Sequence, residues 1–255
     1  MDRFLEGKTA LVTGASRGLG RAIAEDLAAL GALVAINYAS NDDAARETLA
    51  AIESKGGKAF LIKNAQGSYE AAEELTAALD RELMARTGNT ALDILVNNAG
   101  GGPVANIDAT TPELFEQIFS DNLRGPFYVT KLLKSRLRAG GRVIFVSSLG
   151  ARTALPDYVV YAISKRAVET FTVVMAKELG PNNITVNCIS PGLIASDANA
   201  DIRADEGTRT YLEQSTPLRR LGVPSDLSGV VVSLVSPNMG YVTGQIIEVT
   251  GGMSL

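Results

Sequence analysis

The sequence predicts one α/β domain in which helices cover both faces of a doubly wound parallel sheet. Short β-branched runs alternate with longer segments of helical periodicity, which is the pattern of successive strand–helix–strand units. The expected strands are continuously apolar, as strands are when both faces of a sheet are covered. No linker-like change in composition divides the 255 residues, so we treat residues 1–255 as a single domain.

The individual elements follow from the same patterns. Strands are expected at residues 9–13, 33–38, 59–62, 92–97, 142–147, 185–190 and 245–249. Helices are expected at residues 21–30, 41–55, 69–86, 112–137 and 159–179, where apolar residues recur at helical spacing. Residues 193–216 are acidic and alanine-rich without a long apolar stripe, which favours a mobile lid over the substrate site.

The composition excludes several kinds of site. The chain has no histidine, which rules out triads that use histidine, HExxH zinc sites and dehydrogenases with a histidine acid or base. Its single cysteine, Cys188, rules out an intrachain disulfide and a cysteine-rich metal site. We therefore expect no metal, and we expect Cys188 to be a buried structural residue in a strand.

The charge pattern bears on partners and location. The net charge is -4 with both signs interspersed, so no basic stripe is present for a nucleic acid. The first residues are charged, and the longest apolar runs are too short to span a bilayer. We expect a soluble, cytoplasmic protein with no leader and no membrane partner.

A glycine-rich turn follows the first strand and opens the first helix. It reads Thr13-Gly14-Ala15-Ser16-Arg17-Gly18-Leu19-Gly20. Such glycines let the backbone approach a pyrophosphate that lies against the helix N-terminus. The spacing Gly-x3-Gly-x-Gly differs from the commoner Gly-x-Gly-x-x-Gly, but the preceding strand and the following helix give the context that the motif requires. The turn predicts a Rossmann-type dinucleotide site.

The end of the second strand bears on the choice between NAD(H) and NADP(H). An acidic residue there would bond the adenosine ribose of NAD(H) and repel a 2′-phosphate. The sequence instead has Asn37-Tyr38-Ala39-Ser40-Asn41. Arg17 in the glycine turn is a candidate phosphate partner, and a solvated surface arginine is the alternative interpretation. NADP(H) is therefore favoured, and NAD(H) is the alternative cofactor.

A tyrosine and a lysine four residues apart are the candidate proton-transfer pair. Tyr161 and Lys165 lie in a helical pattern, which places them on one face. Lowering a phenol pKa from about 10 to about 7 takes about 4 kcal/mol. One ammonium at roughly 4 Å, in an effective dielectric of about 20, supplies about that energy. We therefore expect Lys165 to lower the pKa of Tyr161, which would donate a proton to a carbonyl oxygen as hydride reaches the carbon.

A serine at the end of the fifth strand is the third candidate. Ser148 follows the strand expected at residues 142–147, so its hydroxyl lies at the carboxyl edge where doubly wound sheets bind ligands. From there it would donate a hydrogen bond to the substrate carbonyl. Lys165 would also hold the hydroxyls of the nicotinamide ribose.

Together these motifs resemble the short-chain dehydrogenase/reductase family, in its compact branch, over essentially the whole chain. The segments that carry the resemblance are Thr13-Gly14-x3-Gly18-x-Gly20, Asn97-Asn98-Ala99-Gly100, Asn122, Ser148, Tyr161-x3-Lys165 and Pro191-Gly192. The resemblance implies a strand order of 3-2-1-4-5-6-7 and a catalytic tetrad of Asn122, Ser148, Tyr161 and Lys165. Asn122 would hold a helix kink and a water that relays protons to Lys165.

The resemblance also implies where the cofactor lies. Asn97 to Gly100 would lie beside the adenosine, and Pro191-Gly192 with Ile194 beside the nicotinamide. The expected cofactor contacts are Gly14, Ser16, Arg17, Gly18, Leu19, Gly20, Asn37, Tyr38, Ser40, Asn41, Asn64, Ala65, Asn98, Ala99, Gly100, Tyr161, Lys165, Pro191, Gly192, Ile194 and Ser196. The family usually forms tetramers or dimers, so a homotetramer is expected.

The sequence departs from the family's pattern at three places. Asn64-Ala65 stands where the family often has Asp-Val against the adenine, and Ser196 stands where a threonine often contacts the carboxamide. Both changes keep hydrogen-bonding ability, so cofactor binding is still expected. Thr250 replaces a common aspartate before Gly251-Gly252, which we expect to affect local structure or subunit packing.

The expected function is NADP(H)-dependent reduction of a ketone or aldehyde. Within the family the chain is most similar to 3-oxoacyl-acyl-carrier-protein reductases, and Arg136, Arg138 and Lys177 could face an acidic carrier protein or be ordinary solvated charges. An NAD(H)-dependent dehydrogenase of a sugar, steroid or other secondary alcohol is one alternative. A catalytically silent NADP(H)-binding sensor or scaffold is another, because a fold alone does not establish activity.

Overall fold

A parallel seven-stranded sheet forms the centre of the computed structural model, which describes residues 3–195 and 204–253. The strand order is β3-β2-β1-β4-β5-β6-β7, which confirms the expected topology. The strands are β1 (Thr9–Val12), β2 (Leu33–Tyr38), β3 (Lys58–Lys63), β4 (Leu92–Asn97), β5 (Leu137–Val146), β6 (Thr185–Pro191) and β7 (Ile246–Val249). Because every pair in the sheet is parallel, all seven carboxyl ends meet at one edge.

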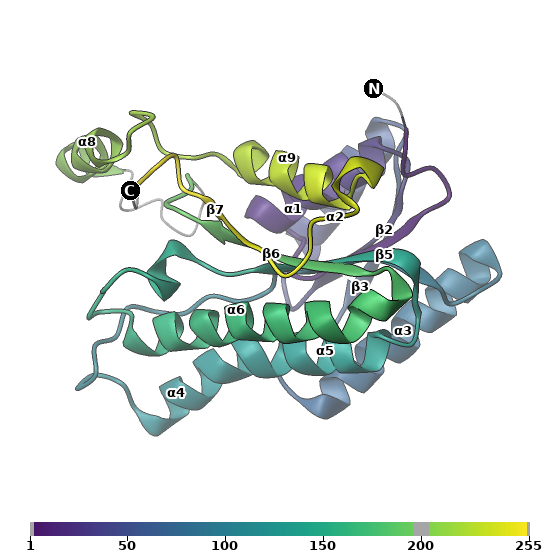
Figure 1. Ribbon diagram of the computed structural model, residues 1–255, viewed down its shortest axis with the longest axis horizontal. Helices are drawn as coiled ribbons and strands as arrows, with labels where there is room; N and C mark the ends of the chain where they lie inside the picture. Colours follow the sequence, from purple (N-terminus) through teal and green to yellow (C-terminus); the bar gives the residue numbers. More distant parts are fainter. Residues whose placement is uncertain (1–2, 196–203, 254–255) are drawn as a thin grey trace.

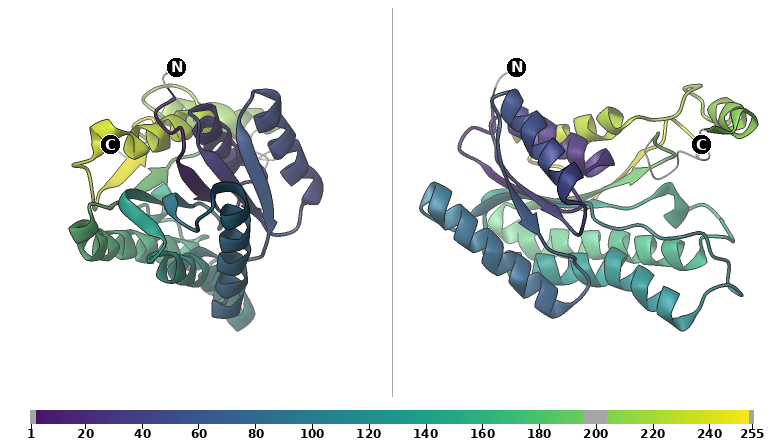
Figure 2. Two further views of the ribbon diagram at one scale, coloured as in Figure 1. Left: turned by 90° about the vertical axis from the view of Figure 1, so that its right-hand side faces the viewer. Right: turned by 180° about the vertical axis from the view of Figure 1, so that it is seen from behind.

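Helices cover both faces of the sheet, as predicted. One layer contains α1 (Gly18–Ala29), α2 (Asp42–Ser54) and α9 (Pro224–Val235), and the other contains α3 (Tyr69–Thr87), α4 (Pro112–Phe119), α5 (Gly125–Leu133) and α6 (Val159–Leu179). Figure 2 shows the same two layers on either side of the sheet from the end and from behind. A further helix, α8 (Glu206–Ser215), buries none of its residues and stands apart from the sheet in Figure 1.

The core consists of two apolar layers, one on each face of the sheet. Val12 and Ile36 belong to the layer beneath α1 and α9, whereas Leu11 and Phe145 belong to the layer beneath α3, α5 and α6. Successive strand residues point to opposite faces, so a continuously apolar strand supplies both layers. This is why the central strands have no polar face.

The helix expected over residues 112–137 is interrupted, and that expectation was wrong in its continuity. A π-helical turn at Ser120–Arg124 separates α4 from α5, and α5 ends at Leu133. Pro126 has no backbone N–H and removes one regular helical hydrogen bond just after this turn. The resulting bend carries Asn122, for which the family resemblance implied a kink.

Helix α9 was not predicted from the apolar pattern, although its start has a local signal. Pro224 occupies the first helical turn, where a missing N–H has no cost. The Asp226 carboxylate accepts a hydrogen bond from the backbone N–H of Val223 at 2.8 Å, which caps the helix.

Candidate active site

The glycine turn has the tight backbone that its sequence predicts. Gly14 and Gly18 have φ angles of 62° and 58°, a left-handed conformation that favours glycine. A Cβ on Gly20 would overlap the carbonyl oxygen of Gly14, and one on Gly14 would lie 2.9 Å from the Cα of Ala99. The turn is therefore packed backbone against backbone and leaves the N-terminus of α1 open to a ligand.

Side-chain hydrogen bonds tie this turn to the end of β4. The Thr13 hydroxyl accepts from the backbone N–H groups of Asn98 at 3.0 Å and Ala99 at 2.9 Å. The Asn98 amide donates in return to the carbonyl oxygens of Thr13 at 2.8 Å and Gly14 at 3.1 Å. Asn98 thus holds two neighbouring strand ends together at the carboxyl edge of the sheet.

A cavity of about 770 Å³ opens at this edge. Its wall contains the expected cofactor contacts Gly14, Ser16, Arg17, Tyr38, Ser40, Asn41, Ala65, Asn98, Ala99 and Gly100. Sequence reasoning missed Ala39, Gln66, Gly101, Gly102, Pro103, Gln117, Ile118 and Asp121, which also line it. These residues follow strand ends or lie in α4 and the π-helical turn. Only those next to a recognised motif could have been predicted from the sequence as part of the cavity wall.

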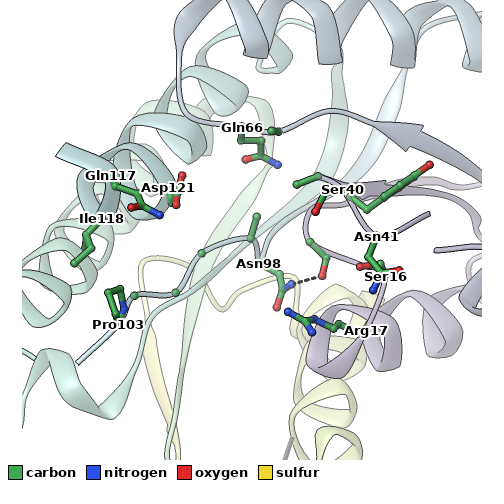
Figure 3. A pocket seen from close by; sticks show the side chains of 18 residues that line it. Ser16, Arg17, Ser40, Asn41, Gln66, Asn98, Pro103, Gln117, Ile118 and Asp121 are labelled. Atoms are coloured by element: carbon green, nitrogen blue, oxygen red, sulfur yellow. Dashed lines mark hydrogen bonds between the residues drawn. The ribbon is translucent and has the colours of Figure 1, made fainter. Parts of the chain in front are cut away.

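The residues around this cavity fit a dinucleotide with a phosphorylated ribose. Figure 3 shows Ser16, Arg17, Ser40 and Asn41 at one end of the cavity. A cation, two hydroxyls and an amide therefore lie together near the N-terminus of α1, and all of these groups can bind a phosphate. The buried oxygen Gln66 Oε1 has no hydrogen-bond partner among the described residues, and Gln66 lines the cavity, so this oxygen can accept from a ligand.

Asn37 is placed differently from the expectation. Its side chain is buried, and its amide nitrogen donates to the carbonyl oxygens of Ile62 at 3.3 Å and Asn64 at 3.0 Å. Its amide oxygen accepts from Gln66 at 2.9 Å. The side chain therefore joins the ends of β2 and β3 and lies outside the cavity wall, as Gly18, Leu19, Gly20 and Asn64 also do.

The π-helical turn brings Asn122 beside the segment that follows β4. Its amide oxygen accepts from the backbone N–H of Gly101 at 2.8 Å, and its amide nitrogen donates to the Gly101 carbonyl at 2.7 Å. A Cβ on Gly100 would overlap the Asn122 oxygen and lie 3.2 Å from Lys165 Nζ. Asn122 and Lys165 therefore converge on one glycine, which must remain a glycine.

Tyr161 and Lys165 lie side by side at the start of α6, but their electrostatics differ from the expectation. The Lys165 ammonium nitrogen donates to the carbonyl oxygen of Val146 at 2.9 Å and lies 5.8 Å from the centre of the Tyr161 ring. Burial lowers the pKa of Lys165 to about 8. Burial also raises the pKa of Tyr161, and a hydrogen bond with Ser148 only partly offsets this.

The expected lowering of the Tyr161 pKa by Lys165 is therefore wrong for this structure. Because Lys165 is itself desolvated and directed at a backbone carbonyl, its charge does not dominate at the phenol. The phenol remains protonated at neutral pH, which is the form that a proton donor requires.

A second cavity, of about 840 Å³, contains the other two candidate groups, Ser148 and Tyr161. The Ser148 hydroxyl accepts from the N–H of Gly150 at 3.1 Å and so caps the short 3-10 helix η2 (Leu149–Ala151). Tyr158 lies edge-to-face with Tyr161, with 6.3 Å between ring centres. Pro191 and Gly192, expected beside the nicotinamide, line the same cavity.

Ile194 lies apart from these groups, in the wall of a smaller cavity of about 220 Å³ that also includes Gly192. Ser196 lies outside the described residues, as do residues 196–203 of the expected lid. Within the rest of that segment, Leu212 of α8 contributes to the wall of the larger cavity. The lid itself stays a prediction.

A family profile described as enoyl-(acyl carrier protein) reductase matches residues 14–254. The chain belongs to the short-chain dehydrogenase/reductase family. It is 36% identical to tetrahydroxynaphthalene reductase of Pyricularia oryzae, covering 97% of this chain and 90% of that protein. It is 38% identical to versicolorin reductase 1 of Aspergillus parasiticus, covering 97% of both.

Among solved structures, the chain is similar to LanV, an angucycline C-6 ketoreductase with bound NADP. The two share 41% identity with a TM-score of 0.93, over 98% of this chain and 96% of LanV. These relatives are named as reductases or as a ketoreductase, so this chain is a member of an oxidoreductase family.

Across residues 3–195 and 204–253, no cluster of three potential metal ligands is present. Within the same residues, no helix combines the length and the apolar character needed to cross a membrane.

Proposed function

We propose that this protein uses NADPH to reduce a ketone in a flat, ring-shaped substrate to a secondary alcohol. The observation that carries the proposal is the position of Tyr161 and Ser148 in the wall of the 840 Å³ cavity. Beside them Lys165 and Asn122 converge on Gly100, which lines the dinucleotide cavity. Reacting groups and cofactor site therefore share one edge of the sheet.

The preference for NADPH is supported by the charge of the dinucleotide cavity. Arg17, Ser40 and Asn41 line one end of it, and no carboxylate of the described wall lies with them. A guanidinium bonds a charged phosphate more strongly than the neutral hydroxyls of a ribose diol. LanV, a relative at 41% identity, has bound NADP.

Tyr161 and Ser148 have distinct roles in the proposed reaction. When bound, NADPH supplies the hydride that reaches the carbonyl carbon. The Ser148 hydroxyl donates a hydrogen bond to the carbonyl oxygen, and the protonated Tyr161 phenol transfers its proton to that oxygen as negative charge develops there. Lys165 holds the ribose hydroxyls, and Asn122 keeps the bend of the helix beside it.

The cavity wall favours a free ring system over a carrier-bound chain. Apart from Ser148, Tyr161 and a charged pair, the wall is largely apolar or aromatic, with Leu149, Leu155, Tyr158, Leu193, Leu212 and Met253. The relatives include reductases named for tetrahydroxynaphthalene, versicolorin and angucyclines, which points to flat aromatic ketones.

The basic residues considered for carrier docking lie elsewhere. Arg136 is already bound to Asp80 at 2.8 Å, and Arg136 and Arg138 flank the start of β5, whereas Ser148 follows its end. Lys177 lies 16 residues beyond Tyr161 on α6, roughly 24 Å along the helix axis. These residues are at the edge opposite the reacting groups, which disfavours a 3-oxoacyl-acyl-carrier-protein substrate.

The test is loss of NADPH absorbance with a panel of carbonyl compounds, run beside NADH. The panel contains tetralones and larger polycyclic ketones, acetoacetyl thioesters, simple cyclic ketones, and a crotonyl thioester as the enoyl control. Turnover confined to the aromatic ketones is expected. Preferred turnover of the acetoacetyl thioester would instead support the carrier-protein reductase, and silence with measurable NADPH binding would support the sensor.

We also propose a homotetramer that uses the outer faces of α5 and α6. A groove of about 580 Å³ lies between these helices, and its wall includes Phe127, Phe171 and Val174, of which Phe127 and Val174 are exposed. Light scattering is expected to give four chains for the wild type and a smaller assembly for Val174→Asp. A monomeric wild type would contradict the proposal.

A further inference from the structure

The 840 Å³ cavity contains one charged pair in an otherwise apolar or uncharged wall. Among the described residues that line it, only Arg152 and Glu248 are charged. Cavities of this kind orient a ligand through a small number of placed polar groups. Ser148 and Tyr161 bond the reacting ketone, so this pair lies in the cavity without a role in the reaction proposed above.

Arg152 is held in a defined position relative to Ser148. It follows the 3-10 helix that Ser148 caps, and its backbone N–H donates to the carbonyl of Leu149 at 2.9 Å. Its guanidinium donates from Nε to Glu169 at 3.3 Å and from Nη1 to Glu248 at 2.9 Å. Two carboxylates from different elements therefore fix the side chain.

Glu169 connects this arginine to the catalytic segment. Its side chain is only 3% exposed, and it also accepts from Arg166 at 2.7 Å and from the Ser147 hydroxyl at 3.0 Å. Ser147 precedes Ser148, and Glu169 is one helical turn beyond Lys165. Through Glu169, Arg152 is therefore held by the same segments that carry Ser148 and Lys165.

The anchored guanidinium has donors left for a ligand. An arginine has five N–H donors, and the two ion pairs use one at Nε and one at Nη1. Among the described residues Nη2 makes no hydrogen bond, and 34% of the side chain is exposed. A fixed, partly exposed guanidinium in an apolar cavity is suited to an oxygen acceptor.

We infer that Arg152 is a specificity-determining residue that binds a second oxygen of the substrate, remote from the reduced ketone. The substrate class is accordingly an aromatic ketone whose ring system carries a further hydroxyl, phenolate or carbonyl oxygen. This inference rests on the proposed ketone reduction. It assigns Arg152 a role in substrate selection and none in proton transfer, because Tyr161 already supplies the proton.

Arg166 provides a matched control for the alternative that Arg152 is only a structural ion-pair partner. Both arginines bond Glu169, but Arg166 is 60% exposed and does not line the cavity. Loss of either removes one ion pair from the same buried carboxylate. Only loss of Arg152 removes a group that faces the substrate.

The experiment compares wild type, Arg152→Gln and Arg166→Gln with α-tetralone and its ring-hydroxylated isomers as the probes. We expect Arg152→Gln to lower kcat/KM by about 10- to 100-fold for at least one hydroxylated isomer, the loss of a charge-assisted hydrogen bond, and to leave α-tetralone unchanged. Arg166→Gln is expected to leave both substrates unchanged. The loss should lie mainly in KM, with the pH profile of kcat unaltered.

Three outcomes are distinguishable. Equal loss for α-tetralone and the hydroxylated isomers, or no loss for any of them, would overturn the role of Arg152. If the wild type reduces no ketone, the proposed function fails and not this inference alone. If Arg152→Gln does not fold, Arg152→Lys keeps the charge without the planar fork, and an unchanged preference for hydroxylated substrates in that variant would also overturn the assignment.

Discussion

The two cavities at the carboxyl edge of the sheet are built in different ways. The dinucleotide cavity is lined mainly by the turns after β1, β2, β3 and β4, with further residues from α4 and the π-helical turn. Its wall includes the glycines Gly14, Gly100, Gly101 and Gly102. The cavity of about 840 Å³, which we propose binds the substrate and call the substrate cavity, is lined by residues of η2 and the segment after it, α6, α8, the end of β6, β7 and the C-terminal segment. Short sequence motifs specify much of the dinucleotide cavity. The substrate cavity depends instead on which side chains, distant in sequence, the fold brings into contact.

The largest effect on turnover is expected at Tyr161, the proton donor of the proposed reaction. Tyr161→Phe keeps the ring but removes the proton donor, so kcat should fall by about 10³-fold while NADPH binding is kept. Tyr158→Phe is the matched control, because Tyr158 lines the same cavity 6.3 Å away without contact to the proposed reaction. Steady-state kinetics with NADPH fluorescence titration measures both, and retained turnover in Tyr161→Phe would remove Tyr161 from its role.

The next effect tests whether the dinucleotide cavity depends on backbone contact. Gly20→Ala places a Cβ against the Gly14 carbonyl and 2.6 Å from the Asn98 amide, so the turn must shift. We expect a loss of stability of about 1–3 kcal/mol and NADPH binding weakened by about 10- to 100-fold. Gly229→Ala is the control, since nothing lies within 4 Å of a Cβ there and the helix should gain about 1 kcal/mol. Similar urea-unfolding midpoints for both variants would refute the close-packing argument.

The predictability of each part follows from this contrast. The glycine turn could be predicted because the left-handed backbone at Gly14 and Gly18 is one that glycine adopts readily and other residues rarely adopt. The strand order was available only through the resemblance to a known family. The structural position of the Asn37 side chain could not be predicted from the sequence. Its hydrogen-bond partners Ile62, Asn64 and Gln66 are distant in sequence, and together they satisfy its buried amide. The same holds for Arg152, whose partner Glu248 is 96 residues away.

A smaller effect tests how the dinucleotide cavity selects its cofactor. Arg17→Gln removes the cation that lines the end with Ser40 and Asn41. NADPH binding should weaken about tenfold, the value of one charge-assisted hydrogen bond, while NADH binding stays the same. Arg46→Gln is the control, because Arg46 is exposed on α2, bonds Asp43 and does not line the cavity. Equal weakening of both cofactors in Arg17→Gln would mean that the 2′-phosphate is recognised elsewhere.

The smallest effect concerns Lys165, whose buried ammonium lies 3.2 Å from the position of a Cβ on Gly100. Burial lowers its pKa from 10.5 to about 8, so between those values the unfolded chain binds more protons than the folded one. The contribution of Lys165 to stability should therefore rise with pH, by about 1 kcal/mol from pH 7 to pH 9. Cys188 contributes with the opposite sign as the pH reaches the ordinary thiol value, because burial raises the pKa of that thiol to about 12 and the folded chain keeps a proton that the unfolded chain loses.

Lys165→Met isolates this contribution, since it keeps a long side chain and removes the titrating group. Urea unfolding at pH 7 and pH 9 compares the two proteins with Cys188→Ala present in both, because the charges of Lys165 and Cys188 shift each other's pKa and the thiol contribution would not otherwise cancel. The protein that keeps Lys165 should gain about 1 kcal/mol more than the Lys165→Met protein over this range. Equal gains would mean that Lys165 remains fully charged beside the Val146 carbonyl up to pH 9. The Lys165 ammonium would then be hydrated in the folded protein. The space around it would contain more water than the close packing at Gly100 indicates.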